Sequence, residues 1–146
     1  MGYSNAYNAY QKTNVSTASQ GRLVVLLYEG AIKQLKLALS FIEPDGKIKP
    51  SQIEKFGIAI QKTQSIITEL QVSLDMEKGG DIARNLMSLY LYFNEELVAA
   101  SIGHDRKKLE FVLNMMGQLV ESWRQISNST ANAPAAQIDN AVNIVG

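Results

Sequence analysis

Residues 23–42 read LVVLLYEGAIKQLKLALSFI, and they decide the fold class because apolar side chains recur every three to four positions. That spacing places side chains on one face of an α-helix. One stripe consists of Val24, Leu27, Tyr28, Ala31, Leu35, Ala38 and Ile42. A second stripe consists of Leu23, Leu26, Leu37 and Phe41. The helix is therefore apolar over an unusually wide arc. We predict that it starts at an N-cap, Ser19, and ends at the turn Pro44-Asp45-Gly46.

Three further segments have the same helical spacing. The second helix follows Pro50, where Ser51-Gln52-Ile53-Glu54 matches a capping box, and it closes at Lys78-Gly79-Gly80. The third is predicted from about Asp81 to Gly103, and the fourth starts at an N-cap, Asp105. Long amphipathic helices joined by short loops favour antiparallel neighbours. The sequence therefore predicts an all-α protein, an antiparallel up-down four-helix bundle over residues 19–127.

Residues 1–18 are predicted to form a short N-terminal helix or arm. Tyr3, Tyr7 and Tyr10 are spaced by four and three residues, so in a helix they share one face. We hypothesise that this arm covers part of an apolar groove until a client arrives.

Residues 128–146 are predicted to be a flexible tail, because they are rich in Ala, Asn and Ser and contain one charged side chain, Asp139. A weak apolar group in the tail is a candidate for docking on the bundle. Its members are Ile138, Val142, Ile144 and Val145.

The composition excludes several classes of site and disfavours others. The 14 basic and 14 acidic residues balance, whereas a nucleic-acid binder normally has a basic excess. Absence of cysteine excludes disulfides and cysteine–zinc sites, and a single histidine excludes a His-rich metal site. No signal peptide is recognisable, and the longest apolar run, residues 23–28, is far shorter than the ~18 residues of a membrane span. We therefore expect a cytoplasmic protein without membrane insertion.

The sequence contains no convincing set of catalytic residues. Ser101, His104 and Asp105 contain the side-chain types of a catalytic triad, but an ordinary turn histidine beside an N-cap explains them better. Gly79-Gly80 lacks the rest of a phosphate-binding loop and fits a helix C-cap and turn. The basic run of residues 106–108 fits a solvated helix face. We predict no enzyme, no cofactor and no metal.

The first and third helices have more apolar side chains than the core of a bundle requires. The surplus is either core that the terminal segments cover, or a groove for a helix of another chain. Periodicity fits both interpretations equally.

Two stretches resemble the signatures of a known family, the flagellar export chaperones FliS. The first contains Tyr10, Val15 and Thr17-Ala18-Ser19 and continues through residues 23–32. The second is SLDMEKGGDIARNLMSLYLY, residues 73–92. Leu119 and Trp123 fit the last helix of the family, and the resemblance spans roughly residues 7–127. Departures from the family pattern are Gln20 in place of proline, Glu29 in place of aspartate, and Glu95-Glu96 where basic residues are common.

The resemblance implies a small antiparallel helical bundle without cofactor or enzymatic activity. It implies a cytoplasmic chaperone that binds the disordered C-terminal segment of flagellin, about one to one. Binding prevents premature polymerisation, and the complex is presented to the type III export gate of the flagellum. A disordered client must be ordered on binding, so a long apolar surface is physically appropriate.

The client-binding surface is predicted to combine the arm, the signature face of the first helix and positions of the third. Its predicted members are Tyr7, Tyr10, Val15, Thr17, Ala18, Leu23, Tyr28, Ile32, Asn85, Leu89 and Tyr92. Two other classes of function stay open. One is a structural bundle that self-associates through the surplus stripe, and homodimerisation of the client-free protein is compatible with either class. The other is a small nucleic-acid-binding regulator, which the charge balance disfavours.

Overall fold

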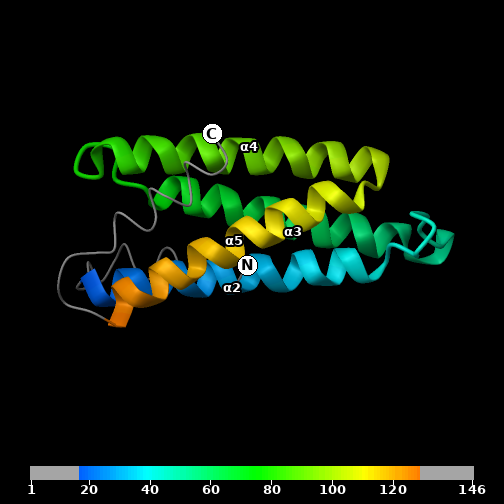
Figure 1. Cartoon of the computed structure of the whole chain (residues 1–146), viewed down its shortest axis with the longest axis horizontal. Coiled ribbons are helices and arrows are strands. Elements are labelled where there is room, and N and C mark those ends of the chain that lie inside the picture. The colour runs from blue at the N-terminus through cyan, green and yellow to red at the C-terminus, as the bar shows by residue number, and fades with distance from the viewer. Residues whose placement is uncertain (1–16, 129–146) are drawn as a thin grey trace.

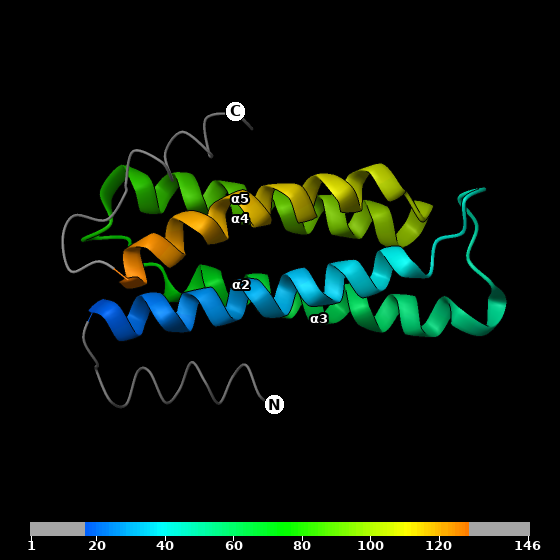
Figure 2. The ribbon, with the colours of Figure 1, turned by 60° about the horizontal axis from the view of Figure 1, so that its bottom comes forward.

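The computed structural model describes residues 17–128, which form four long α-helices and one short 3-10 helix (Figure 1). The helices are α2 (Thr17–Ser40), α3 (Ile53–Ser73), α4 (Gly80–Gly103) and α5 (Arg106–Asn128), and the 3-10 helix η1 spans Pro50–Gln52. Each long helix packs against the next one in the chain, and α5 packs against α2. Figure 2 shows them side by side with alternating directions. The predicted all-α, up-down four-helix bundle is confirmed, while the predicted arm and tail lie outside the described residues except at Thr17, Ala18 and Asn128.

The first apolar stripe of α2 forms the centre of the core. Tyr28, Ala31, Leu35 and Ala38 are all 0% exposed. The alanines allow close approach of the neighbouring helices because their side chains are small. The second stripe divides: Leu23 and Phe41 are half-buried, whereas Leu26 and Leu37 are exposed. The apolar surplus of α2 is therefore part core and part surface.

The connection between α2 and α3 contains the predicted turn. Gly46 has a φ of 84°, and its amide donates to the carbonyl of Glu43 at 2.8 Å. Ile42 and Ile48 form an isolated antiparallel bridge across this loop, and both side chains are buried. The turn thus closes the end of the core between α2 and α3.

Two predicted N-caps are wrong. Ser19 lies inside α2, which includes Thr17 and Ala18 before it. The capping box at Ser51 and Glu54 does not form, because Ser51 belongs to the 3-10 helix that begins at Pro50. The N-cap of α3 is Gln52, and its side chain makes no capping hydrogen bond.

The N-cap predicted at Asp105 is confirmed. Its Oδ1 atom accepts hydrogen bonds from the backbone amides of Lys107 at 3.0 Å and Lys108 at 3.4 Å. These are amides of the first turn of α5, which have no partner within the helix.

Helix α3 ends at Ser73, earlier than predicted, because Leu74 is extended and Asp75 starts a turn. The Oδ1 atom of Asp75 accepts from the amides of Glu77 at 3.1 Å and Lys78 at 2.9 Å. The two glycines therefore begin α4 instead of ending α3: Gly79 is its N-cap and Gly80 its first residue.

Candidate functional site

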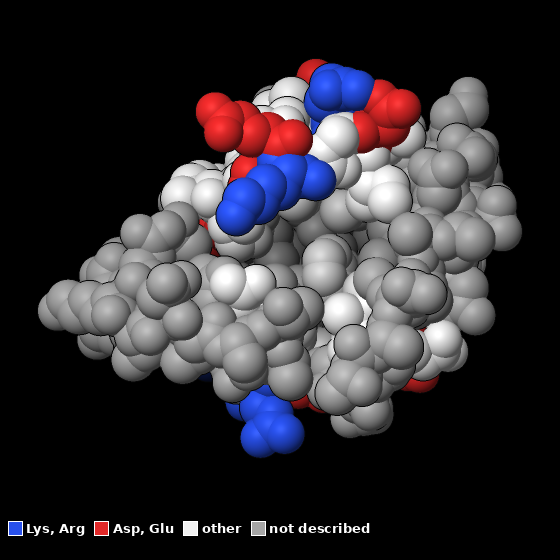
Figure 3. All heavy atoms as spheres, turned by 90° about the vertical axis from the view of Figure 1, so that its left-hand side faces the viewer, with Lys and Arg blue, Asp and Glu red and all other residues white. Residues whose placement is uncertain are grey.

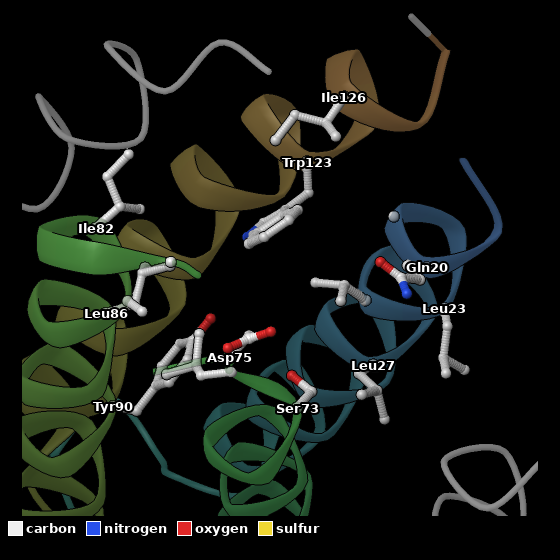
Figure 4. Close-up of a pocket in the computed structure, with 15 residues that line it drawn as sticks. Gln20, Leu23, Leu27, Ser73, Asp75, Ile82, Leu86, Tyr90, Trp123 and Ile126 are labelled. Atoms are coloured by element: carbon white, nitrogen blue, oxygen red, sulfur yellow. The ribbon is translucent and has the colours of Figure 1, made fainter. Parts of the chain in front are cut away.

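An open, mainly apolar pocket of about 200 Å³ lies at one end of the bundle. The start of α2, the turn between α3 and α4, the start of α4 and the end of α5 meet around it (Figures 1 and 4). Its apolar walls are formed by Leu23, Val24, Leu27, Ile82, Leu86, Trp123 and Ile126. We call it the end pocket. The pocket lies where these helices end, and no other helix of residues 17–128 covers its apolar walls.

Within residues 17–128, few polar side chains line the end pocket, and they are Gln20, Ser73, Asp75 and Tyr90. Gln20 reaches it from α2, Ser73 from the end of α3 and Asp75 from the turn after α3 (Figure 4). Most of the acidic and basic side chains visible on this end of the molecule lie along one edge, with others at the opposite edge (Figure 3). Asp75 is the single charged side chain among the described residues that line the pocket. Such a site suits apolar side chains of a ligand better than charged ones.

Beneath the end pocket, two tyrosines form a buried polar pair. The hydroxyls of Tyr28 in α2 and Tyr90 in α4 are 2.5 Å apart, and the ring centroids are 6.3 Å apart in an edge-to-face arrangement. Burial raises the pKa of both phenols well above the usual value, because a phenolate in the core would lose its hydration. The hydrogen bond with Tyr90 partly offsets this rise in the pKa of Tyr28. Both tyrosines are thus neutral hydrogen-bonding members of the core.

The glycine pair has a packing explanation. A Cβ atom on Gly79 would lie 2.5 Å from the Cβ of Ala83 and 2.6 Å from the carbonyl oxygen of Asp75. Gly80 has a φ of 55°, in the left-handed region that favours glycine. The glycines bring the turn tightly onto α4, which shapes one wall of the end pocket.

The predicted client-binding residues within residues 17–128 lie in different environments. Tyr7, Tyr10 and Val15 lie outside the described residues, and Thr17 and Ala18 belong to the first turn of α2. Leu23 lines the end pocket. Ile32 and Asn85 are half-buried, and Ile32 packs on the core.

Tyr28 and Leu89 require a correction. Tyr28 is 0% and Leu89 is 3% exposed, so neither side chain reaches a client while the bundle is closed. Both are core residues. Their apolar character in the family signatures reflects packing between helices.

Tyr92 is exposed, but it belongs to the surface between α4 and α5. Its ring packs edge-to-face on Phe111 with centroids 5.8 Å apart. The neighbouring Glu96 raises the pKa of Tyr92 and also pairs with Lys108, whose Nζ lies 3.3 Å from Oε2 of Glu96. Tyr92 does not line the end pocket.

Sequence reasoning missed Ile82, Trp123 and Ile126 as site residues. Ile82 belongs to the second family signature and Trp123 fits the last helix of the family, but neither was assigned to the client-binding surface. A periodic apolar pattern does not indicate which helix ends meet around an open pocket. Two departures from the family pattern also find a place in the structure. Gln20 lies at the margin of the end pocket, and Glu29 pairs with Arg124 across α2 and α5 at 3.0 Å.

The described residues offer no alternative site with catalytic or metal-binding geometry. Residues 17–128 contain no group of three or more metal-ligating side chains, and none of their helices is long and apolar enough to cross a membrane. His104 is the left-handed C-cap of α4, and its ring packs edge-to-face on Phe56 with centroids 5.4 Å apart. It is a turn histidine, as predicted.

Comparison with known proteins identifies the family. A model of the family described as flagellar protein FliS matches residues 3–130. The chain belongs to the FliS family. The flagellar secretion chaperone FliS of Campylobacter jejuni is 31% identical over 127 residues, which cover 85% of this chain and 92% of that protein. The FliS chaperone of Salmonella typhimurium is 35% identical over 114 residues (77% and 80%), and that of Bacillus subtilis is 31% identical over 129 residues (88% and 91%).

Membership in the FliS family supports a chaperone role in flagellar secretion. FliS proteins are chaperones and not enzymes, in agreement with the prediction from the sequence. The end pocket is built largely from the two stretches that resemble the FliS signatures, residues 23–32 and 73–92, together with Trp123.

Proposed function

We propose that this protein binds the C-terminal segment of flagellin in the cytoplasm, prevents its premature polymerisation and presents it to the flagellar type III export gate. Family membership supports the role of a secretion chaperone. The observation that carries the choice of client surface is the end pocket, an open apolar hollow that the signature segments themselves form. A chaperone for a segment that is disordered before binding needs such a surface, because apolar burial must compensate for the ordering of the client.

The revised contact surface begins at Leu23, Ile82 and Trp123 in the end pocket. It continues over the arm, where Tyr7, Tyr10 and Val15 are retained as proposed contacts. One pocket of this size accepts one apolar anchor of a client, which favours the stoichiometry of one chaperone to one flagellin. Once bound, a client segment cannot join a growing filament, so sequestration follows from mass action.

Calorimetry with a peptide from the C-terminal end of the flagellin of the same organism tests the proposal. We expect 1:1 binding, and Leu23→Gln should weaken it at least tenfold because a wall of the pocket becomes polar. The matched control is Leu91→Gln, since Leu91 is 52% exposed on α4 and does not line the pocket. No heat with the unaltered protein would contradict the C-terminal segment of flagellin as the client, and loss of binding only with Leu91→Gln would place the client on α4.

The alternative function, a self-associating structural bundle, has one observation in its favour. Leu91, Val98 and Ile102 are 52%, 49% and 80% exposed, and their spacing of seven and four residues places them on one face of α4. This alternative predicts that sedimentation equilibrium finds a dimer that Ile102→Gln dissociates, without any binding of the flagellin peptide.

A further inference from the structure

We propose that the end pocket is also a docking site for the chain's own C-terminal segment, residues 138–146. The tail would occupy the hollow in the client-free protein and leave it when an external apolar segment competes. Docking of the tail does not depend on the identity of the client, whereas its regulatory consequence rests on the proposed function.

The C-terminal end of α5 lies at the end pocket, so the tail that follows it starts beside the pocket. Trp123 and Ile126, in the last turns of α5, are walls of the end pocket, and α5 ends at Asn128. Nine residues, 129–137, separate the end of α5 from Ile138. A flexible linker of that length would span about 17 Å on average, whereas neighbouring helices are about 8–10 Å apart. Ile138 can therefore reach any part of the pocket opening without displacing α5.

The chemistry of the tail matches that of the pocket. Residues 138–146 read IDNAVNIVG, and Ile138, Val142 and Val145 are spaced by four and three residues. In an α-helix, this spacing would place the three side chains on one face. Asp139 is the single charged side chain of residues 127–146, and Asp75 is the single charged side chain among the described residues that line the pocket. The aliphatic face of the tail can enter the hollow while Asp139, which follows Ile138, stays outside it.

Covalent attachment makes a weak contact sufficient. A short flexible linker gives the attached segment an effective concentration on the order of millimolar. A tail whose free peptide binds with a Kd of about 1 mM is thus docked about half of the time. Such an occupant protects apolar side chains from other partners, yet a client of micromolar affinity displaces it readily.

Trp123 provides a direct readout, because it is the only tryptophan of the chain and a wall of the pocket. Acrylamide quenching of its fluorescence would be compared in the full chain, in a chain that ends at Asn128, and in the full-length variant Ile138→Asp with Val142→Asp. Ala131→Asp with Ala135→Asp is the control that adds the same charge within the linker. We expect about a twofold larger quenching constant for the shortened chain and for the Ile138/Val142 variant, and no change for the control.

Adding a synthetic peptide of residues 136–146 to the shortened chain should restore the shielding of Trp123. Circular dichroism establishes that each variant retains its helices. Equal quenching in the full and shortened chains overturns the proposal. So does a rise that follows deletion of residues 1–15 alone, which would assign the pocket to the N-terminal arm. Shielding that grows with protein concentration would assign the pocket to a second copy, with the same consequence.

The regulatory consequence is measured separately with the flagellin peptide. Removal of residues 129–146 should tighten client binding about twofold to tenfold, because the client no longer competes with the tail. If no variant binds the peptide while Trp123 still shows tail-dependent shielding, the proposed client is wrong and the docking site stands. If the peptide binds but the shortened chain binds it no better, the tail does not compete with the client.

Discussion

At the scale of single residues, Gly79 illustrates how a short turn constrains the wall of the pocket. Replacing it with alanine would place a Cβ 2.5 Å from the Cβ of Ala83 and 2.6 Å from the backbone oxygen of Asp75. Neither neighbour is the end of a flexible side chain, so the turn has to move. We expect Gly79→Ala to lower the free energy of unfolding by about 1–3 kcal/mol in urea denaturation.

The control for Gly79 is Gly57, which lies within α3 and would have no heavy atom within 4 Å of an added Cβ. Gly57→Ala should raise the free energy of unfolding by about 0.5–1 kcal/mol, because alanine favours the helix. Opposite signs for the two substitutions identify packing at the turn. Destabilisation by both would instead indicate that this bundle tolerates no added methyl group on its helices.

Tyr28 and Tyr90 make a prediction about pH. Their pKa values are raised in the folded protein, so between the ordinary pKa of about 10 and the folded value only the unfolded chain releases these protons. The stabilising contribution is complete below pH 10 and is lost as the pH rises. The free energy of unfolding should fall by about 1.4 kcal/mol per pH unit for each tyrosine above pH 10.

Urea unfolding between about pH 8 and 11 measures this slope. The double variant Tyr28→Phe with Tyr90→Phe removes both hydroxyls together and should flatten the curve. An unchanged slope would mean that other groups cause the alkaline loss. The single variant Tyr28→Phe should lower the free energy of unfolding by more than half of the loss in the double variant. The reason is that it leaves the buried hydroxyl of Tyr90 without its partner.

The contrast between Tyr28 and Leu23 shows how far residue types alone predict a binding site. Both belong to the same signature and to apolar stripes of α2, yet one is 0% exposed and the other lines an open pocket. Core and apolar binding surface need the same side chains. The side on which a neighbouring helix lies distinguishes them, and that depends on packing between distant segments.

At the scale of elements, the N-cap predicted at Asp105 was right and the capping box predicted at Ser51 was wrong, and the local backbone conformation explains the difference. Asp105 is the second of the two residues between α4 and α5, and it caps α5 through its own side chain. Ser51 follows Pro50, and the chain begins a 3-10 turn there before α3 starts. The capping-box pattern specifies which groups can bond, but the conformation set by the preceding proline decided whether they meet.

The N-cap of α5 is testable with Asp105→Ala. Its carboxylate accepts from two amides of the first turn, and we expect a loss of about 1 kcal/mol in the free energy of unfolding. Gln118→Ala, at an exposed position in the middle of α5, is the control and should change stability by less than about 0.5 kcal/mol. A loss below that value for Asp105→Ala would show that other contacts hold the start of α5.

At the scale of the whole molecule, the four-helix bundle was predictable because each helix has its own apolar period and the loops are short. The end pocket was not, because Leu23, Ile82 and Trp123 come from three helices whose ends meet only in the folded bundle. The turn at Asp75 also ends α3 earlier than the apolar pattern suggested. Leu74 and Asp75, which follow α3, therefore line the pocket instead of continuing the helix.

The charge of the whole molecule leads to a last prediction, on the salt dependence of client binding. The chain carries 14 basic and 14 acidic residues, and Asp75 is the single charged side chain among the described residues that line the end pocket. Apolar contacts are weakly sensitive to ionic strength, so the Kd for the flagellin peptide should change less than about threefold between roughly 50 and 500 mM NaCl. A nucleic-acid binder with several phosphate contacts would lose a factor of about 10³ or more over an even narrower range. Calorimetric titrations at several salt concentrations therefore separate the two classes: a steep linear decline in log K with log salt would mean that clustered charges, and not the end pocket, hold the partner.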